Sequence, residues 1–295
     1  TGLKVEVLSN SEQRFISYKA VVSNEAFHQM TDQGAAVVDI GGGSIQITLF
    51  IHGNVVTTQH LMLGTVRVRE KLAAIEQSLK HVDEQIQELV DKELEVFKAL
   101  YLKDGEIKYV VLMGDYIGEI MKKLDKTKSL TVKTDRFISF MEKMNRKNVE
   151  DIAELLNLSN DHDPLIIPAV VLYKRTVQEL GAQEIYVPGF SINDGIVYDY
   201  AQKHNMVKAR HDFDEDVLSA ARNMAKRYWG YKPHIEALAD MAVLVYDAMK
   251  KMHGLGKKER LLLKTAAILH DCGKYVSLVN GAECAYTIIM ASEII

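Results

Sequence analysis

The stretch Val37-Val38-Asp39-Ile40-Gly41-Gly42-Gly43-Ser44 decides the fold of this chain. Its apolar start is typical of the end of a buried strand, and its three glycines are typical of a turn without side chains. Residues 45–51 then alternate between apolar and polar types, which predicts a second strand. A strand, a glycine-rich turn and a strand can direct backbone N–H groups at phosphate oxygens.

An acidic residue and a hydroxyl residue flank the glycines. Asp39 precedes them and can hold a metal ion, directly or through water. The residues Gly41, Gly42, Gly43 and Ser44 would form the cradle for a phosphate group. An ordinary glycine-rich hairpin is the alternative, and the flanking Asp39 and Ser44 favour phosphate binding over it.

The composition indicates a folded chain of about two domains. Its 295 residues are 47% hydrophobic and 26% charged, enough to bury a large core. A net charge of -4 argues against a general nucleic-acid binder, although a local basic groove could hold a polyanion. Two cysteines make no disulfide framework, which favours a reducing cytoplasm. No apolar run approaches ~20 residues and no signal peptide is visible, so we expect no membrane span. The start at Thr1 and the apolar end at Ile295 lead us to expect a fragment.

Strands and helices are expected to alternate up to about residue 200. The predicted strands cover residues 3–8, 37–40, 47–51, 55–61, 107–113 and 184–187, with a hairpin turn at Gly53-Asn54 inside an antiparallel meander. The predicted helices cover residues 13–26, 65–103, 130–156 and 164–180, with two more starting at 117 and 196. Gly114 lies between a strand end and a helix start, where it could meet a phosphate or form a plain β–α turn.

The pattern is helical from His211 onward. Four segments have helical periodicity, at residues 214–229, 234–253, 258–270 and 282–295. We therefore place a domain boundary between Ala201 and Asp214, and expect the second domain to be all-α and incomplete at its end.

Three residues of this helical part could bind a metal. His270 and Asp271 are adjacent at a predicted helix end, and His234 opens another helix thirty-six residues earlier. Imidazole and carboxylate ligands together suit a borderline divalent metal. An ordinary helix end closed by Gly273 is the alternative interpretation.

Five segments, in order along the chain, resemble the exopolyphosphatase / guanosine pentaphosphate phosphohydrolase family. They are Val5–Gln13, the phosphate motif Asp39–Ser44, Leu63-Gly64-Thr65-Val66-Arg67, Gly189–Asp199 and the helical part Tyr228–Lys274. The resemblance covers essentially all of the chain. It implies an α/β actin-like (RNase H-like) lobe with a mixed sheet at residues 1–205, the second lobe of the family. An all-α HD-like domain would follow at residues 211–295.

The resemblance implies a phosphohydrolase. Such an enzyme releases the terminal phosphate of inorganic polyphosphate or guanosine pentaphosphate in a cleft between two lobes. Glycine-loop amides and a divalent cation such as Mg²⁺ hold the phosphoryl group, and a Glu activates water for in-line attack. Asp39 would be the ligand of the metal or of a water bound to the phosphate. The resemblance also implies a homodimer, and we expect a cytoplasmic location and neither nucleic acid nor membrane as a partner.

Four departures from the family pattern concern the chemistry. Gln13 stands at the position of the catalytic Glu, with Glu12 one residue away, and Gln46 replaces a second Glu. An uncharged amide cannot act as a base at neutral pH. The family's first lobe has no counterpart ahead of Thr1, and Glu283 stands where members often carry a His.

Three functions therefore stay open at the level of sequence. The first is a phosphohydrolase of this family with Glu12 or another group as base. The second is a weakened or inactive relative that binds polyphosphate or a guanine alarmone as a sensor or regulator. The third is a metal-dependent hydrolase built on His234, His270 and Asp271.

Overall fold

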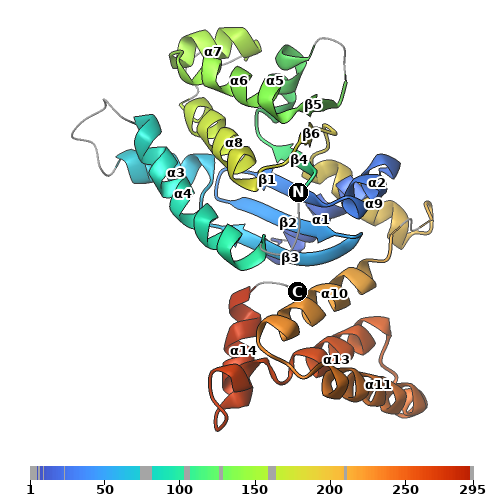
Figure 1. The fold of residues 1–295 in the computed structure, drawn as a ribbon. Helices are drawn as coiled ribbons and strands as arrows, with labels where there is room; N and C mark the ends of the chain where they lie inside the picture. Colours follow the sequence, from blue (N-terminus) through green and yellow to red (C-terminus); the bar gives the residue numbers. More distant parts are fainter. Residues whose placement is uncertain are drawn as a thin grey trace. The chain divides into compact units, whose positions relative to one another are not determined.

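The computed structural model describes residues 5, 7–8, 10–22, 24–73, 82–102, 107–125, 129–158, 164–208 and 211–292. The chain folds into two compact units (Figure 1). The first consists of Thr1–Gly53 and His60–Lys208, and the second of Asn54–Gln59 and Ala209–Ile295. No helix in the described ranges is long and apolar enough to cross a membrane.

A six-stranded mixed sheet forms the centre of the α/β part, as the sequence predicts. The strand order is β3-β2-β1-β4-β6-β5. Strand β1 runs antiparallel to β2 and parallel to β4, β4 runs parallel to β6, and β5 is antiparallel to β6. The strands are β1 (Ala35–Ile40), β2 (Ile45–Ile51), β3 (Asn54–Leu61), β4 (Tyr109–Gly114), β5 (Thr131–Lys133) and β6 (Glu184–Tyr186).

Burial explains why β1 is apolar along most of its length. Ala35, Ala36, Val38 and Ile40 are fully buried, as expected for a central strand with a parallel neighbour. Strands β2 and β3 are joined by His52 and Gly53, which both have positive φ (51° and 74°). Positive φ at both central residues is the signature of a type I′ hairpin turn. The turn therefore lies one residue before the predicted Gly53-Asn54.

Nine described helices belong to the α/β part. They are α1 (Asn10–Val22), α2 (Glu25–Asp32), α3 (Thr65–Ala73), α4 (Val82–Tyr101), α5 (Ile117–Leu124), α6 (Thr134–Asn145), α7 (Val149–Leu156), α8 (Ile166–Leu180) and α9 (Ile192–Lys203). Helix α8 is largely buried, with ten of its side chains in the core.

Three predicted helices or strands of the α/β part were wrong in part. Val5, Val7 and Leu8 are exposed and lie in no strand, and the rest of the predicted strand at 3–8 lies outside the described residues. The predicted helix 13–26 divides into α1 and α2 because Asn24 caps a new helix by accepting from the Ala26 N–H. The predicted helix 130–156 begins with β5, and it divides again where Asn148 caps α7.

The second unit is helical apart from residues 54–59, which belong to β3. Its elements are α10 (Phe213–Arg227), α11 (Lys232–Ala248), α12 (Lys250–His253), α13 (Lys257–Leu269), the 3₁₀ turn η2 (Cys272–Tyr275) and α14 (Gly281–Ser292). The predicted helix 234–253 is therefore two helices, α11 and α12. The Val55 carbonyl accepts hydrogen bonds from Ser219 Oγ (3.2 Å) and Asn223 Nδ2 (2.9 Å) of α10.

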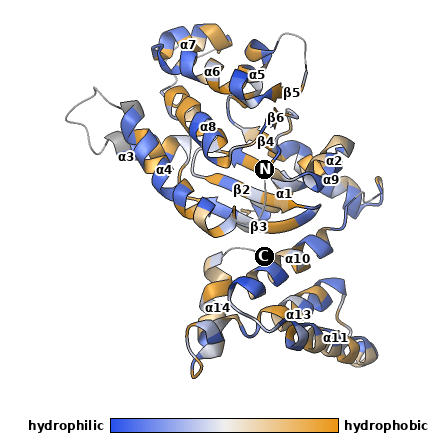
Figure 2. Cartoon of the chain, viewed as in Figure 1, coloured by the Kyte–Doolittle hydropathy of each residue, from blue (hydrophilic) through white to orange (hydrophobic). Residues whose placement is uncertain are grey.

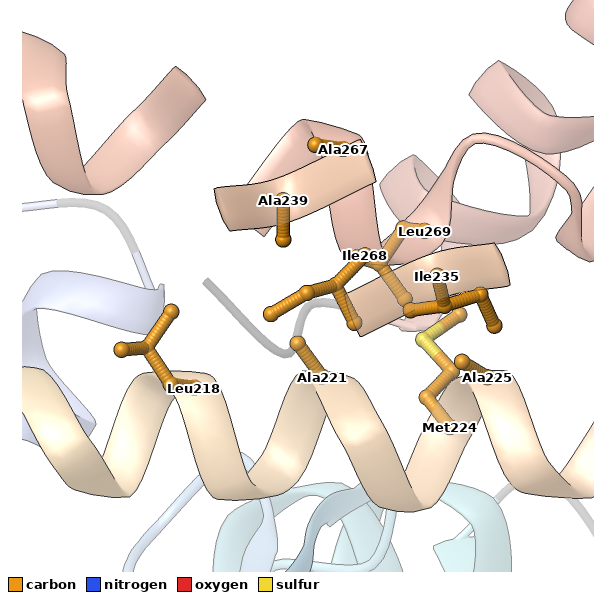
Figure 3. Packing of buried hydrophobic residues seen from close by; sticks show 9 residues of the cluster. All are labelled: Leu218, Ala221, Met224, Ala225, Ile235, Ala239, Ala267, Ile268 and Leu269. Atoms are coloured by element: carbon orange, nitrogen blue, oxygen red, sulfur yellow. The ribbon is translucent and has the colours of Figure 1, made fainter. Parts of the chain in front are cut away.

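The core of the helical unit lies between α10, α11 and α13. Figure 3 shows Leu218, Ala221 and Met224 projecting from α10 toward Ile268 and the neighbouring residues of the cluster. Alanines at Ala221 and Ala239 are fully buried, which allows the helix backbones to approach closely. In Figure 2 hydrophobic colour also appears on α11 and α14, where Met241, Leu244, Tyr286 and Met290 are exposed.

Candidate functional site

Asp39 lies at the carboxyl end of β1, where the glycine turn begins. The strand register places it opposite Gln46 on antiparallel β2 and beside Met113 on parallel β4. Directly opposed residues of an antiparallel pair point to the same face of the sheet. The structure therefore brings together two of the predicted site residues, Asp39 and Gln46.

The glycine turn closes on itself and packs against the start of α3. The Gly41 N–H donates to the Ser44 carbonyl (3.1 Å). The Gly41 carbonyl accepts from the Thr65 N–H (3.1 Å), and the Gly42 carbonyl accepts from the Val66 N–H (2.9 Å). A trans peptide directs its N–H opposite to its C=O. The N–H groups of Gly42 and Gly43, which share peptides with these two carbonyls, therefore point away from α3.

Those two N–H groups are available to a ligand. Within the described part of the chain, no protein group accepts a hydrogen bond from the Gly42 or Gly43 N–H. A Cβ added at Gly41 or Gly43 would meet no atom within 4 Å, so open space adjoins the turn. A Cβ at Gly64 would lie 2.2 Å from the Gly42 carbonyl oxygen, which explains the glycine in the Leu63–Arg67 segment. The turn thus has the geometry of an anion-binding backbone concavity.

A buried cluster surrounds the Asp39 carboxyl group. Burial raises the pKa of Asp39, the Ser17 hydroxyl opposes this by donating a hydrogen bond, and the nearby negative charge of Asp115 raises the pKa further. The fully buried Tyr173 hydroxyl bonds the carbonyls of Met113 (2.9 Å) and Asp115 (3.0 Å). Burial also raises the pKa of Tyr173, so this hydroxyl stays neutral and acts as a donor.

Gly114 holds the ends of β1 and β4 together. Its φ is +107°, and an added Cβ would lie 2.1 Å from the Ile40 carbonyl oxygen. The same carbonyl accepts from the Asp115 N–H (3.2 Å). The next residue, Tyr116, has a positive φ of 65° although it is not glycine. This close approach places Asp115 at the edge of the sheet where Asp39 lies.

Helix α1 supplies the other predicted catalytic positions. Gln13 lies one turn before Ser17, only about 40° from it around the helix, whereas Glu12 lies about 140° away. Because Ser17 bonds Asp39, Gln13 shares the face of α1 that is directed at the carboxylate. Both Gln13 and Glu12 are exposed. The helix register therefore places Gln13, and not Glu12, on the side of the site.

Helix α9 fixes the position of α1. A Cβ at Gly195 would lie 2.0 Å from the Ile16 carbonyl oxygen, so the two helices touch through their backbones. Lys19 Nζ lies 2.5 Å from Asp199 Oδ1, with both side chains mostly buried. Burial raises the pKa of Asp199, but hydrogen bonds from Lys19 and Lys203 outweigh it and hold the pKa below its usual range.

Sequence reasoning missed Ser17, Asp115 and Tyr173. Asp115 could have been found, because parallel strands end at the same edge of a sheet and it directly follows β4. Ser17 could have been found only by placing α1 against the sheet. Tyr173 lies near the middle of a buried helix and has no local motif.

The helical unit contains a separate group of ligand-type side chains. His234, His270 and Asp271 have ligand atoms that all lie within 4.8 Å of one another. Glu283 is not among the described side chains that meet there. The structure thus brings together the three residues that the sequence singled out in this part of the chain.

The chain is similar to several known proteins. Residues 1–204 match the model of the Ppx/GppA phosphatase family. The bifunctional 3-dehydroquinate synthase/phosphatase of Fusobacterium nucleatum subsp. nucleatum is 25% identical over 209 residues, which is 67% of this chain and 30% of that protein.

Solved structures with the same fold include proteins from Aquifex aeolicus and Cytophaga hutchinsonii. A Ppx/GppA protein from Aquifex aeolicus is 17% identical, with a TM-score of 0.54, over 69% of this chain and 66% of that one. An exopolyphosphatase from Cytophaga hutchinsonii is 13% identical, with a TM-score of 0.53, over 67% of this chain and 64% of that one. The chain therefore spans less than two thirds of the length of each of these three proteins.

Proposed function

The chain belongs to the Ppx/GppA phosphatase family, and we propose that it acts in the release of terminal phosphate from inorganic polyphosphate or guanosine pentaphosphate. The observation that supports this most directly is the orientation of the Gly42 and Gly43 N–H groups. They point away from α3, and within the described part of the chain no protein group accepts from them. A terminal phosphoryl group offers oxygens that would accept hydrogen bonds from both.

The carboxylates of Asp39 and Asp115 fit a hard divalent cation such as Mg²⁺, which prefers oxygen ligands. Asp115 raises the pKa of Asp39 by repulsion, and a cation beside the two carboxylates would offset that repulsion. When bound, the cation would neutralise charge on the phosphate oxygens. The Ser17 hydroxyl would keep one Asp39 oxygen oriented, and Tyr173 would keep the Asp115 backbone in place.

Water activation is the step in which this chain differs from the family pattern. Gln13 and Gln46 can orient a water molecule through hydrogen bonds but cannot accept its proton at neutral pH. Phosphoryl transfer depends chiefly on positioning and charge stabilisation, and a glutamine orients the attacking water in small GTPases. We infer that Gln13 positions the water and that turnover is correspondingly slow. Glu12, on another side of α1, is the competing candidate for a base.

The experiment measures phosphate release from long-chain polyphosphate and from guanosine pentaphosphate, with Mg²⁺ and with EDTA. It uses the full-length protein that contains this chain, and substrate binding is measured in the same samples. Asp39→Asn should reduce release by about 100-fold or more, in the range seen when a charge-stabilising group is lost. Asp240→Asn, an exposed carboxylate on α11, is the matched control and should have no effect.

Two outcomes would overturn the proposal. Tight binding of polyphosphate without release would indicate a sensor or regulator in place of a hydrolase. Release that survives Asp39→Asn would place the chemistry at another site.

A further inference from the structure

The connection between α11 and α13 carries apolar side chains on its outside. These two helices share the core of the helical unit (Figure 1), and residues 249–256, which include the short helix α12, join them. Met249, Met252 and Leu255 of this connection are all exposed. Met252 is 81% exposed, so the described residues leave most of its side chain in water. A cluster of such side chains is a surface that a partner could cover.

Four lysines flank these apolar side chains. Lys250 and Lys251 lie in α12, and Lys257 and Lys258 open α13. All four are exposed, and within the described ranges none of them forms an ion pair. Because lysine is almost never fully buried, we expect this region to face solvent in the full-length protein as well. We call residues 249–258 the hairpin tip.

The acidic groups near the hairpin tip do not neutralise these lysines. Asp247 accepts from Arg260, with Nε 2.9 Å from Oδ1 and Nη2 2.9 Å from Oδ2. Glu259 Oε2 accepts from the Gly256 N–H (2.9 Å). Residues 247–260 contain five basic and two acidic residues, a net charge of +3 within a chain whose net charge is -4. The hairpin tip is therefore a local positive surface on an acidic chain.

Hydrogen bonds fix the backbone of the hairpin tip. The Tyr246 hydroxyl donates to the Gly256 carbonyl (2.8 Å). His253 Nε2 lies 2.9 Å from the Tyr246 carbonyl oxygen, and His253 Nδ1 accepts from the Leu255 N–H (3.0 Å). The neutral ring therefore carries its proton on Nε2, and it links the end of α11 to the backbone beyond α12. A surface that is already ordered needs little reorganisation when it binds.

We propose that the hairpin tip binds an anionic lipid surface, with Met252 and Leu255 inserted among the lipid chains and the four lysines at the phosphate head groups. Basic residues and a few buried apolar side chains together give reversible binding to such a surface. A partner helix of acidic character is the alternative, but it would need a groove for its apolar face. Met252 and Leu255 lie instead on a turn between helices, which suits insertion into a lipid interface.

The proposal revises the expectation that no membrane is a partner of this chain. That expectation rested on the lack of a long apolar run, and no helix in the described ranges could cross a membrane. Contact with one face of a bilayer requires only a few apolar side chains with basic residues around them. It is also independent of phosphate release, which the α/β part would carry out with or without lipid.

The experiment measures co-sedimentation of the full-length protein that contains this chain with two kinds of vesicle, phosphatidylcholine alone or equal parts of phosphatidylcholine and phosphatidylglycerol. Binding should require phosphatidylglycerol and should weaken at high salt, because ions screen exposed charges. Lys250→Gln and Lys251→Gln together should weaken binding about 25-fold, since each lysine near an anionic surface contributes about fivefold. Met252→Ser should weaken it about 10-fold by removing an inserted side chain.

Matched controls separate the hairpin tip from other sources of vesicle binding. Lys143→Gln with Lys147→Gln removes two exposed lysines of the α/β part, and Met206→Ser removes an exposed methionine there. Both controls should bind vesicles as the wild type does, and circular dichroism establishes that every variant is folded.

Three outcomes would overturn the proposal. The first is no binding to vesicles that contain phosphatidylglycerol, which would leave an acidic protein as the occupant of the hairpin tip. The second is an equal loss of binding in the two lysine pairs, which would mean adsorption through overall charge. The third is wild-type binding by Met252→Ser, which would exclude insertion. None of them would bear on phosphate release from soluble substrates.

Discussion

Replacement of Gly114 by alanine should unfold the edge of the sheet that carries Asp39 and Asp115. Gly114 has φ +107°, and the new Cβ would lie 2.1 Å from the oxygen, 2.8 Å from the carbon and 2.9 Å from the nitrogen of Ile40. These are backbone atoms of the neighbouring strand. They cannot turn aside as the end of a flexible side chain can, so β1 and β4 must separate.

Three contributions set the size of the effect. A side chain at this φ costs about 1–3 kcal/mol, and forcing an extra carbon into a packed region costs about 1–3 kcal/mol more. The hydrogen bond from the Asp115 N–H to the Ile40 carbonyl is lost as the strands separate, at about 1 kcal/mol. We expect the free energy of unfolding to fall by about 3–7 kcal/mol, a large part of the stability of a typical domain.

The assay is urea unfolding followed by circular dichroism, with Gly118→Ala as the matched control. Gly118 lies four residues away in α5, and a Cβ there would meet no atom within 4 Å. Because alanine is a better helix former than glycine, this control should be neutral or stabilise by up to about 1 kcal/mol. If Gly114→Ala changed the free energy of unfolding by less than 1 kcal/mol, the close approach of β1 and β4 would be refuted.

Three further predictions concern charges around the site. At pH 7 and without metal, Asp39→Asn should raise the urea midpoint of unfolding. A carboxyl whose pKa is raised in the folded state lowers the free energy of unfolding as the pH rises, and asparagine removes this loss. The gain should disappear in acid, where the carboxyl is protonated in both the folded and the unfolded protein. Gln13→Glu should raise the rate of phosphate release by about 100-fold or more by supplying a base, whereas Glu12→Gln should leave the rate unchanged. Lys19→Met should lower the free energy of unfolding by about 1–3 kcal/mol at pH 7, measured in urea, because Asp199 loses a partner in a mostly buried place. That difference should narrow as the pH falls through the lowered pKa of Asp199, since the protonated carboxyl no longer needs the ammonium.

Much of the α/β fold could be predicted because its signals are local. The glycine turn, the alternation in β2 and the apolar run of β4 are each visible within a few residues, and the mixed sheet they predict is confirmed. The resemblance drawn from the ordered motifs is confirmed by the family match. Errors occurred where capping decides the outcome, as at Asn24, because a single side-chain hydrogen bond divides a continuous helical pattern.

The site could be predicted only in part because its residues belong to distant segments. Asp39 and Gln46 follow from the hairpin, whose register pairs residues on either side of one turn. Ser17 and Tyr173 reach the site only through tertiary packing of α1 and α8, which leaves no trace in local spacing. The same packing decides which face of α1 is directed at Asp39. The sequence alone therefore could not show that Gln13, and not Glu12, lies on that face.

The amides at positions 13 and 46 have a consequence for the charge of the site. Burial and the charge of Asp115 already disfavour the ionised form of Asp39. Each further carboxylate would add repulsion that only a cation could offset. Gln46 lies directly opposite Asp39, so a glutamate there would place two acidic groups in a cross-strand pair, an arrangement that is destabilising. A site with glutamines can therefore keep its shape without metal, whereas a site with glutamates depends on one. We therefore expect the turn at Gly41–Gly43 to be folded before any cation binds.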